Sequence, residues 1–346
     1  MSLGSVDPAL EPLVRELVEK NKDRIFPGVA GLRVENVELG TSSIYRGTNF
    51  HLPVTVRAKT DNESYGADLW LKSQEGLNRV FPLLSAYYEL LGADVVPKPI
   101  FAWGSQSGPA SILVMSRVNG RCIRDILLKR TVFRRAGSLA PIFVSNGSKM
   151  RRFHDAFPAS GRVRARSIFE NTAELVRSTR HLDSAEKSKV LLHLDRHQNT
   201  LSGVNALPLY KLHHDWVLRN ILVDEDGIDV IIDFESMQYP DNLRWYDVGC
   251  FLMNVESQLK WSPLVNIGTL RQIWRSFWRG YTEAAGVPDG LNGDQVAALL
   301  YVVRLNYLYG GTFRPADLDR FTGFHDRRFF RSVRQSVLAG HHTELE

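Results

Sequence analysis

The spacing of apolar residues changes between residues 116 and 120, and this change restricts the possible folds more than any other feature of the chain. Before it, apolar residues alternate with polar ones in short runs, as in the strands of a half-buried sheet. After it, they recur at every third or fourth position, as in amphipathic helices. At 346 residues the chain also exceeds the usual size of a single hydrophobic core. We therefore predict an α+β chain of two parts, residues 1–118 and residues 119–346.

The first part is predicted to contain an opening amphipathic helix and then five strands around one further helix. The stripe of the opening helix consists of Leu10, Leu13, Val14, Leu17 and Val18. The strands are expected at residues 32–39, 50–56, 67–71, 100–103 and 112–115, and the further helix at residues 77–91. Gly and Asn residues separate the first strands, which is typical of an antiparallel sheet joined by hairpins.

The second part is predicted to be mainly helical, with one β-hairpin. Its clearest helical stripe consists of Leu270, Ile273, Trp274, Phe277 and Tyr281. The hairpin joins residues 221–223 to residues 228–232 through a turn that ends in Asp226 and Gly227. A glycine at that point supplies the positive φ that a tight turn needs.

Composition excludes several classes of protein. With 44% apolar and 23% charged residues, the chain has the composition of a folded globular protein rather than a disordered one. Its two cysteines, Cys122 and Cys250, are too few for a disulfide framework or a four-thiolate zinc site. It shows no signal-peptide pattern and no run of about 18 apolar residues. We therefore expect a cytoplasmic protein that is not inserted in a membrane.

Three side chains with oxygen donors surround the predicted hairpin. Asp215 precedes it, Asn220 stands at the start of its first strand, and Asp233 follows its second strand. A hairpin brings its two ends together, so we expect Asn220 and Asp233 to converge, with Asp215 a loop away. Such donors suit a hard cation. Alternatively, Asp215 and Asn220 form an Asx turn and Asp233 is an exposed carboxylate at the end of a strand.

The same three residues meet the needs of phosphoryl transfer. Its loose transition state demands positioning and charge neutralisation rather than covalent work by the protein. On this hypothesis Asp215 accepts the proton of the acceptor hydroxyl. Asn220 and Asp233 then hold Mg²⁺ against the β- and γ-phosphates. His213 is expected to support the loop backbone rather than take part in the reaction.

Three motifs in this order resemble those of a known family. The HxDxxxxN pattern of His213, Asp215 and Asn220 is followed by IDFE at residues 232–235 and YDVG at residues 246–249. Together they are similar to the motifs of the aminoglycoside phosphotransferase and choline kinase superfamily of kinase-fold small-molecule kinases. The resemblance implies a two-lobed protein-kinase-like fold. Its antiparallel-sheet N-lobe, the first part, binds ATP or alternatively GTP, and its helical C-lobe, the second part, carries the catalytic loop and the acceptor site.

The resemblance also implies a role for Lys72, which would clamp the α- and β-phosphates. Lys72 alternates with Leu71 and therefore points to the opposite face of its strand. The alternative is a solvated lysine on an edge strand. Leu84 stands where the family has the helix glutamate that orients this lysine. Either Glu75 or Glu89 replaces that glutamate, or the lysine is held otherwise, or the chain is a weakened kinase.

Two further segments are candidates for nucleotide binding. Residues 40–43 lie between the first two strands, where backbone N–H groups and the hydroxyls of Ser42 and Ser43 can face phosphate. An ordinary hairpin turn explains the same residues equally well. Main-chain groups from Ser116 to Val118, at the boundary between the two parts, are candidates for pairing with adenine.

The acceptor is predicted to be a hydroxylated small molecule. A protein kinase would need a long segment after its metal-binding Asp, but only thirteen residues separate Asp233 from Asp247, and HRD and DFG triplets are absent. Residues 121–200 carry 17 basic and 7 acidic side chains. If this segment lines the acceptor site, it repels choline and polycationic aminoglycosides. We therefore favour an anionic or neutral acceptor, such as a sugar, an antibiotic or a glycan precursor.

Two alternatives remain for this basic segment. In the first, its arginines form a solvated face; they include Arg151, Arg152, Arg162, Arg164 and Arg166. In the second, the chain is a catalytically weak kinase-like protein that binds an anionic partner such as nucleic acid. Only Phe133 and Phe153 are interleaved with the basic residues as stacking aromatics, which disfavours nucleic acid. The sequence leaves the oligomeric state open.

Overall fold

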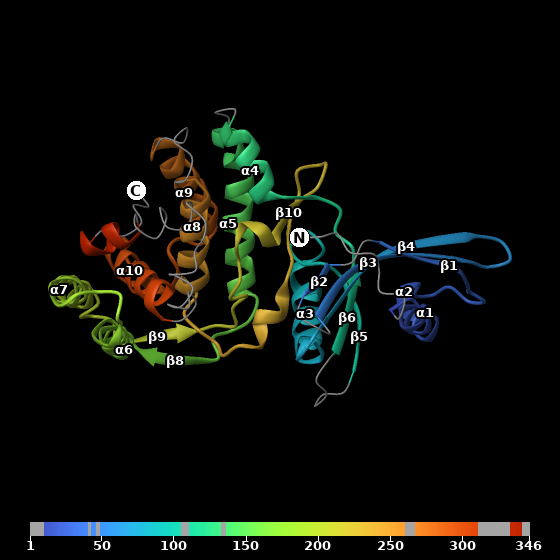
Figure 1. Cartoon of the computed structure of the whole chain (residues 1–346), viewed down its shortest axis with the longest axis horizontal. Helices are drawn as coiled ribbons and strands as arrows, with labels where there is room; N and C mark the ends of the chain where they lie inside the picture. The colour runs from blue at the N-terminus through green and yellow to red at the C-terminus, as the bar shows by residue number, and fades with distance from the viewer. Residues whose placement is uncertain are drawn as a thin grey trace. The chain divides into compact units, whose positions relative to one another are not determined.

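Residues 230–238 leave the helical part of the chain and rejoin the strands formed by its first 120 residues. The computed structural model describes residues 10–40, 43–45, 49–104, 111–132, 136–259, 267–310 and 333–340 (Figure 1). Its first unit comprises Met1–Gly120 with Val230–Gln238, and its second unit comprises Arg121–Asp229 with Tyr239–Glu346. The sequence predicted two continuous parts and did not predict that residues 230–238 belong to the first unit.

The first unit contains a six-stranded antiparallel sheet in the order β1-β3-β4-β6-β5, with β2 paired to β3. The strands are β1 (Arg33–Leu39), β2 (Ser43–Tyr45), β3 (Asn49–Lys59), β4 (Ser64–Gln74), β5 (Pro99–Trp103) and β6 (Ser111–Ser116). The helices are α1 (Leu10–Lys20), α2 (Lys22–Ile25), α3 (Leu77–Leu91) and the 3-10 helix η3 (Phe234–Gln238), which β11 (Asp229–Ile231) precedes. The five predicted strands and both predicted helices are confirmed, and β2 is an addition.

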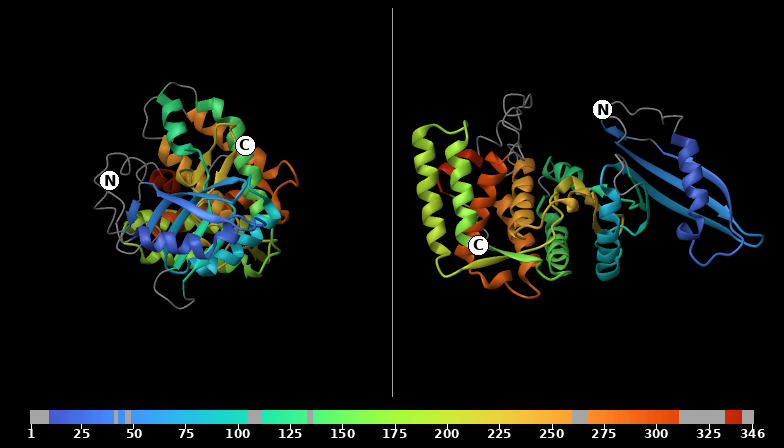
Figure 2. Two further views of the ribbon diagram at one scale, coloured as in Figure 1. Left: turned by 90° about the vertical axis from the view of Figure 1, so that its right-hand side faces the viewer. Right: turned by 90° about the horizontal axis from the view of Figure 1, so that it is seen from below.

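Alternation along the long β3–β4 hairpin separates an apolar face from a polar one. Leu52 and Val54 of β3 and Leu69 of β4 lie on the apolar face, and each is at most 1% exposed. The predicted apolar stripe of α1 packs into the same core (Figure 2). The opposite face carries polar side chains, among them Lys72, whose register partner on β3 is His51. The sheet therefore aims Lys72 away from the core, as its alternation with Leu71 predicts.

Contacts at both ends of residues 230–238 hold this segment in the first unit. At its start, the N–H of Ile231 donates to the carbonyl of Val95 at 3.1 Å. At its end, Gly76 has a φ of +83°, and a Cβ there would lie 2.3 Å from Oε1 of Gln238. Glycine suits this left-handed backbone, which residues with a side chain rarely adopt. These contacts place the IDFE motif beside α3 and β4.

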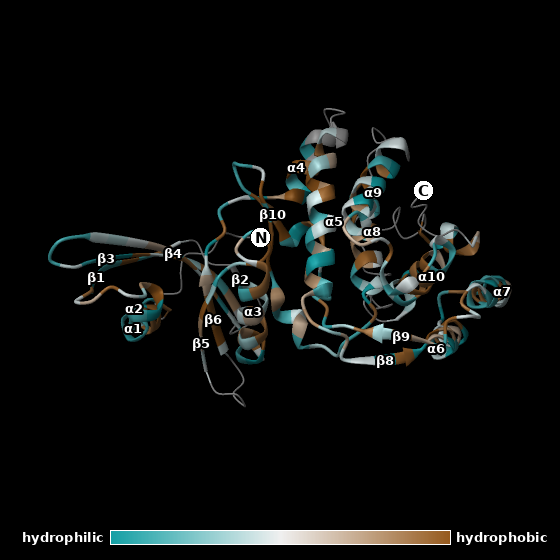
Figure 3. Ribbon diagram, turned by 180° about the vertical axis from the view of Figure 1, so that it is seen from behind, coloured by the Kyte–Doolittle hydropathy of each residue, from teal (hydrophilic) through white to brown (hydrophobic). Residues whose placement is uncertain are grey.

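The second unit is mainly helical, and Figure 2 shows α6 and α7 side by side. Its helices are α4 (Ile123–Val132), α5 (Ala140–Asp155), α6 (Ala165–Ser178), α7 (Ser184–Thr200), α8 (Trp245–Leu259), α9 (Ile267–Thr282) and α10 (Gly293–Tyr309). Its shorter elements are β7 (Arg121–Cys122), β8 (Gly161–Arg164), β9 (Ala206–Leu209), β10 (Ile221–Val223), η1 (Ala136–Leu139), η2 (Leu218–Asn220) and η4 (Pro288–Gly290). Apolar residues run along α10, whereas α7 is largely polar (Figure 3). No helix in the described ranges is both long and apolar enough to cross a membrane.

The turn after β10 has the predicted chemistry. Gly227 adopts a φ of +83°. The N–H of Asp224 donates to the carbonyl of Ile228 at 3.0 Å, and the carboxylate of Asp224 accepts the N–H of Ile228 at 2.7 Å. β10 itself pairs with β7 in an antiparallel manner. The turn fixes the point at which the chain reverses after Asp215 and Asn220.

Two glycines allow α5 and α9 to approach each other closely. A Cβ on Gly147 would lie 2.1 Å from the carbonyl oxygen of Phe277, and a Cβ on Gly280 would lie 1.9 Å from the carbonyl oxygen of Val144. The predicted stripe of α9, which includes Phe277 and Tyr281, is buried at this contact. The backbones of the two helices are therefore in contact without an intervening side chain.

Replacement of Gly280 by alanine is expected to destabilise the protein by at least about 2 kcal/mol, because the new methyl group overlaps backbone atoms of α5. Urea unfolding measures this change. Gly203→Ala is the matched control, since a Cβ at Gly203 meets nothing within 4 Å. Equal stabilities of the two variants would contradict the close contact between the helices.

Candidate active site

The loop between β9 and β10 brings Asp215 and Asn220 together. Nδ2 of Asn220 donates to Oδ2 of Asp215 and to the main-chain carbonyl of the same residue, both at 2.9 Å. Nη2 of Arg219 donates to the two carboxylate oxygens of Asp215 at 2.8 and 3.2 Å. Because the amide hydrogens of Asn220 face Asp215, the Oδ1 atom of Asn220 is the one that suits a cation.

A buried carboxylate, that of Asp247 in α8, holds the backbone of this loop. Asp247 is fully buried and accepts the N–H groups of His213 at 3.0 Å and His214 at 2.9 Å. His214 has a φ of +62°, a conformation that costs a non-glycine residue about 1–3 kcal/mol. The ring nitrogen Nδ1 of His213 accepts the N–H of Asp215 at 3.2 Å. His213 thus supports the loop backbone, as expected from the sequence.

His154 of α5 completes the surroundings of Asp247. Its Nε2 lies 3.3 Å from Oδ2 of Asp247, and its Nδ1 lies 2.9 Å from the hydroxyl of Tyr281. Burial lowers the pKa of His154 and raises the pKa of Tyr281, so a neutral imidazole donates to Asp247 and accepts from the tyrosine. Burial alone would raise the pKa of Asp247, but the hydrogen bond from His154 keeps that pKa below its usual value. A stable anion therefore anchors the loop that carries Asp215.

A second buried network lies under Trp216, the residue after Asp215. The indole N–H of Trp216 donates to Oδ1 of Asn146 at 3.1 Å. Nδ2 of Asn146 and Nζ of Lys149 donate to the carboxylate of Asp229 at 3.3 and 3.0 Å. Asn146 and Asp229 are each 1% exposed. Sequence reasoning missed this network, whose one visible signal is the polar pair Asn146 and Lys149 on the buried face of α5.

In the first unit, Lys72 is only 2% exposed, and its ammonium group pairs with the carboxyl groups of Asp233 and Glu235. β4 lies between β3 and β6 in the sheet. The alternative of a solvated lysine on an edge strand is therefore wrong. Asp233 has a φ of +76°, a left-handed conformation that aspartate tolerates better than most residues.

The carboxyl groups beside Lys72 differ in acidity. Burial alone would raise the pKa of Asp233, but its hydrogen bond with Glu235 and the charge of Lys72 hold that pKa well below its usual range. Burial, the hydrogen bond with Asp233 and the negative charge of Asp233 raise the pKa of Glu235 to about 7. Burial and the charge of Lys72 lower the pKa of His51 to about 4. At neutral pH the cluster thus holds an ionised Asp233 beside a carboxyl group that titrates.

Glu235 is the acidic partner of Lys72 that sequence reasoning missed. Leu84 is fully buried in α3, and the two predicted substitutes, Glu75 and Glu89, are both exposed. The structure pairs Lys72 with Glu235 instead, so the expectation of Glu75 or Glu89 in this role is wrong. The signal was present in the IDFE motif, where Glu235 follows the predicted metal ligand by two residues.

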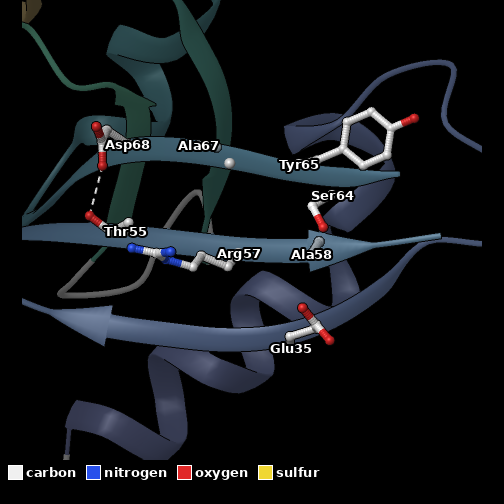
Figure 4. Close-up of a pocket in the computed structure, with 9 residues that line it drawn as sticks. Glu35, Thr55, Arg57, Ala58, Ser64, Tyr65, Ala67 and Asp68 are labelled. Atoms are coloured by element: carbon white, nitrogen blue, oxygen red, sulfur yellow. Dashed lines mark hydrogen bonds between the residues drawn. The ribbon is translucent and has the colours of Figure 1, made fainter. Parts of the chain in front are cut away.

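The face of β3 and β4 that carries Lys72 also holds an open polar hollow of about 560 Å³ (Figure 4). Thr55 and Asp68 line it, and the hydroxyl of Thr55 donates to Asp68 at 2.7 Å. Asp68 and Lys72 share this face at positions about 13 Å apart along the strand. Between them lies the half-buried Trp70, whose ring packs edge-on against His51 with centroids 6.3 Å apart. Trp70 is a further residue of this face that sequence reasoning missed.

Of the other predicted nucleotide contacts, the structure describes Ser116 and Val118 fully and Ser43 in part. Ser42 lies outside the described residues, and only the backbone of Ser43, in β2, is described. The N–H of Ser116 donates to the carbonyl of Lys98 at 2.8 Å within the sheet. Val118 follows the end of β6. The main-chain contacts of Ser116 and Val118 with adenine remain a prediction.

The structure places the predicted catalytic and metal residues in both units. Asp215 and Asn220 lie in the second unit, and Asp233 lies with Lys72 in the first. The convergence of Asn220 with Asp233 on one cation remains a prediction. The Asx-turn alternative does not describe Asn220, because its side chain contacts a carboxylate and a carbonyl earlier in the chain.

Comparison with known protein families shows a phosphotransferase, a kinase with a hydroxyl group as acceptor. The sequence profile of the Phosphotransferase enzyme family (APH) matches residues 73–284, which is more than half of the chain. The chain therefore belongs to this family. No curated protein sequence matches the chain.

Solved structures of a kinase and of a phosphotransferase share the fold of this chain. A glucosamine kinase in complex with glucosamine, ADP and inorganic phosphate is 13% identical, with a TM-score of 0.54 over 92% of this chain and 96% of that one. A thermostable mutant of aminoglycoside phosphotransferase APH(4)-Ia, in a ternary complex with AMP-PNP and hygromycin B, is 14% identical, with a TM-score of 0.55 over 94% of this chain and 97% of that one. At such identities the likeness shows the fold.

The raised pKa of Glu235 predicts how the stability of the metal-free protein depends on pH. The unfolded chain ionises this carboxyl near pH 4.5, whereas the folded protein holds the proton up to about pH 7. The folded state therefore binds more protons in this window, and stability falls as the pH rises through it. Glu235→Gln has no proton to lose at this position, so it should lose less stability between pH 4.5 and 7.

Urea unfolding at several pH values in the presence of EDTA checks this expectation. Glu89→Gln is the control, because Glu89 is exposed in α3. If the wild-type protein and Glu235→Gln have the same dependence of stability on pH, the pKa of Glu235 is not raised.

Proposed function

We propose that the enzyme transfers the γ-phosphoryl group of ATP, bound with Mg²⁺, to a hydroxyl of a neutral or anionic small molecule. The observation that carries this proposal is the carboxylate of Asp215, which Asn220 and Arg219 hold at the start of the hairpin in a chain of the phosphotransferase family. The ADP and AMP-PNP bound in structures of similar fold support an adenine nucleotide as donor. GTP is the alternative donor, and a comparison of the two nucleotides distinguishes them.

In this proposal Asp215 accepts the proton of the acceptor hydroxyl as the hydroxyl oxygen attacks phosphorus. The side chain of Asp215 is 26% exposed, so the carboxylate is accessible from solvent. The amide of Asn220 orients this carboxylate, and Asp247 fixes the loop backbone. The proton acceptor is thus in place before the substrate binds, which lowers the cost of reaching the transition state.

The predicted metal ligands have the chemistry that Mg²⁺ prefers, namely oxygen atoms from carboxylate and amide groups. The low pKa of Asp233 keeps its carboxylate ionised at neutral pH. The amide nitrogen of Asn220 donates to Asp215, and the amide oxygen Oδ1 is our proposed metal ligand. When bound, Mg²⁺ would neutralise charge on the β- and γ-phosphates.

We assign Lys72 to the α- and β-phosphates. Its ammonium group has two carboxyl partners in the structure, Asp233 and Glu235. If Asp233 turns to the metal, Glu235 still orients the lysine, which is the task that the resemblance assigned to a glutamate of the helix. Trp70, on the same face of β4, and the main chain of Val118 are our candidates for contacts with the base.

The alternative function, a weak kinase-like protein that binds an anionic partner, has less support. Basic residues of the segment 121–200 have local partners, as Arg151 has in Asp155 and Arg166 in Glu170. The missing helix glutamate was the main reason to expect a weakened enzyme. The pairing of Lys72 with Glu235 weakens that reason.

Asp215→Ala should lower kcat by roughly 10²-fold or more, because it removes the proton acceptor. The assay screens hydroxylated sugars and antibiotics for acceptor-stimulated release of ADP, with this variant as the blank. Asp226→Ala is the matched control, because Asp226 is an exposed carboxylate in the turn of the same hairpin. Normal turnover in Asp215→Ala would exclude Asp215 as the proton acceptor.

Asp233→Asn should raise the Mg²⁺ concentration needed for half-maximal activity by at least about tenfold, because the amide is a weaker ligand than a carboxylate. Titration of Mg²⁺ at fixed ATP measures this change. Asp226→Asn makes the same substitution at an exposed position and should leave the requirement unchanged. An unaltered requirement in Asp233→Asn would argue against Asp233 as a metal ligand.

A further inference from the structure

The catalytic loop carries its own cation, Arg219, directly on the catalytic carboxylate. Nη2 of Arg219 lies 2.8 Å from one oxygen of Asp215 and 3.2 Å from the other. The side chain of Arg219 is nevertheless 62% exposed. A guanidinium group is planar and has five N–H donors, so it can interact with more than one group at the same time.

Arg219 balances the charge of Asp215, our proposed base, so that the loop of residues 213–220 has no net charge. Among residues 213–220, Asp215 is the one acidic residue and Arg219 the one arginine or lysine. Burial lowers the pKa of His214, which is therefore uncharged at neutral pH. A catalytic carboxylate without such a partner would attract an ammonium group near the reacting hydroxyl. Here that attraction is already compensated.

Ion pairs within the basic segment, residues 121–200, support this reasoning. Two of the five arginines on which the charge of the acceptor was predicted to depend, Arg151 and Arg166, have their own carboxylate partners, Asp155 and Glu170. Arg219 lies outside that segment and contacts the catalytic carboxylate itself. Arg219 is therefore the cation on which we base an inference about the acceptor, because it contacts Asp215.

We propose that Arg219 determines the charge of the acceptor. By compensating Asp215, it selects molecules that are neutral or anionic near the reacting hydroxyl and disfavours those with an ammonium group there. The acceptor class is then sugars or polyols without amino groups, or with a carboxylate or phosphate. The inference rests on the proposed function, because it takes Asp215 as the group that contacts the acceptor hydroxyl.

Distance and exposure set the size of the expected effect. A hydroxyl bonded to Asp215 lies about 3 Å from the carboxylate, so substituents next to it lie within about 4–7 Å of the guanidinium. Like charges at that separation, in partly exposed surroundings, repel enough to change affinity by about tenfold. A neutral substituent does not experience this repulsion.

The test uses three sugars that differ in charge at pH 6.5: glucose, glucosamine and glucuronate. Each is run as an acceptor and also as an inhibitor of the basal release of ADP, so that binding is measured even where the sugar is not phosphorylated. The wild-type enzyme should favour glucose or glucuronate over glucosamine. Arg219→Ala should shift this ratio toward glucosamine by at least about tenfold. Arg219→Lys keeps the charge and should stay close to the wild type.

Arg166→Ala is the matched control, because Arg166 also pairs with a carboxylate four residues away, at 2.7 Å, and is 78% exposed. A wild-type preference for glucosamine in either assay would overturn the inference, and so would an unchanged ratio in Arg219→Ala. If Asp215→Ala releases ADP as fast as the wild type with every acceptor, the proposed function fails instead. The two failures are therefore distinguishable.

Discussion

The loop that carries Asp215 depends on one buried carboxylate. Asp247 accepts two consecutive backbone N–H groups from this loop, and one of them belongs to the strained His214. Its third donor, His154, is in turn bonded to Tyr281. Because a buried charge that loses a partner is costly, each member of this chain enforces the position of the next. Helices α5, α8 and α9 therefore each contribute one residue to the hydrogen-bonded chain that supports the loop.

Lys72 and Asp215, the charged residues of the proposed site, both have polar or oppositely charged partners within the protein. Lys72 has carboxyl partners in the first unit, and Asp215 has donors from Arg219 and Asn220 in the second. Substrates that bind to such groups exchange one partner for another and need not strip water from a bare ion. We infer that the protein side chains are largely preorganised and that binding mainly redistributes hydrogen bonds among them.

Sequence periodicity predicted five strands and two helices of the first unit and one helical stripe of the second, since alternation and helical stripes report which face of an element is buried. It did not predict β2, β8 or β9. The helix at residues 77–91 has the predicted bounds, and the predicted stripe of α9 is buried. The order of the motifs was sufficient to identify the family. The boundary near residue 118 lies close to the division of the chain after Gly120, but residues 230–238 return to the first unit through tertiary contacts that no local pattern encodes.

Partners within the site were the part that could not be predicted. Glu235 pairs with a lysine 163 positions earlier, and Asn146 bonds to an aspartate 83 positions later. A carboxylate or an amide looks the same in sequence whether it is solvated or paired, because its identity does not state which distant group will meet it. The family pattern placed the partner of Lys72 on α3, whereas packing of η3 against α3 supplied it from another part of the chain.

The crossing of α5 and α9 has a consequence for how this enzyme can change. Gly147 lies on α5 between Asn146 and His154, the two residues through which that helix supports the catalytic loop. The separation of the two backbones therefore affects the position of the loop that carries Asp215, our proposed proton acceptor. Adaptation to a new temperature that widened or tightened this crossing would retune turnover without altering any residue that meets the substrates.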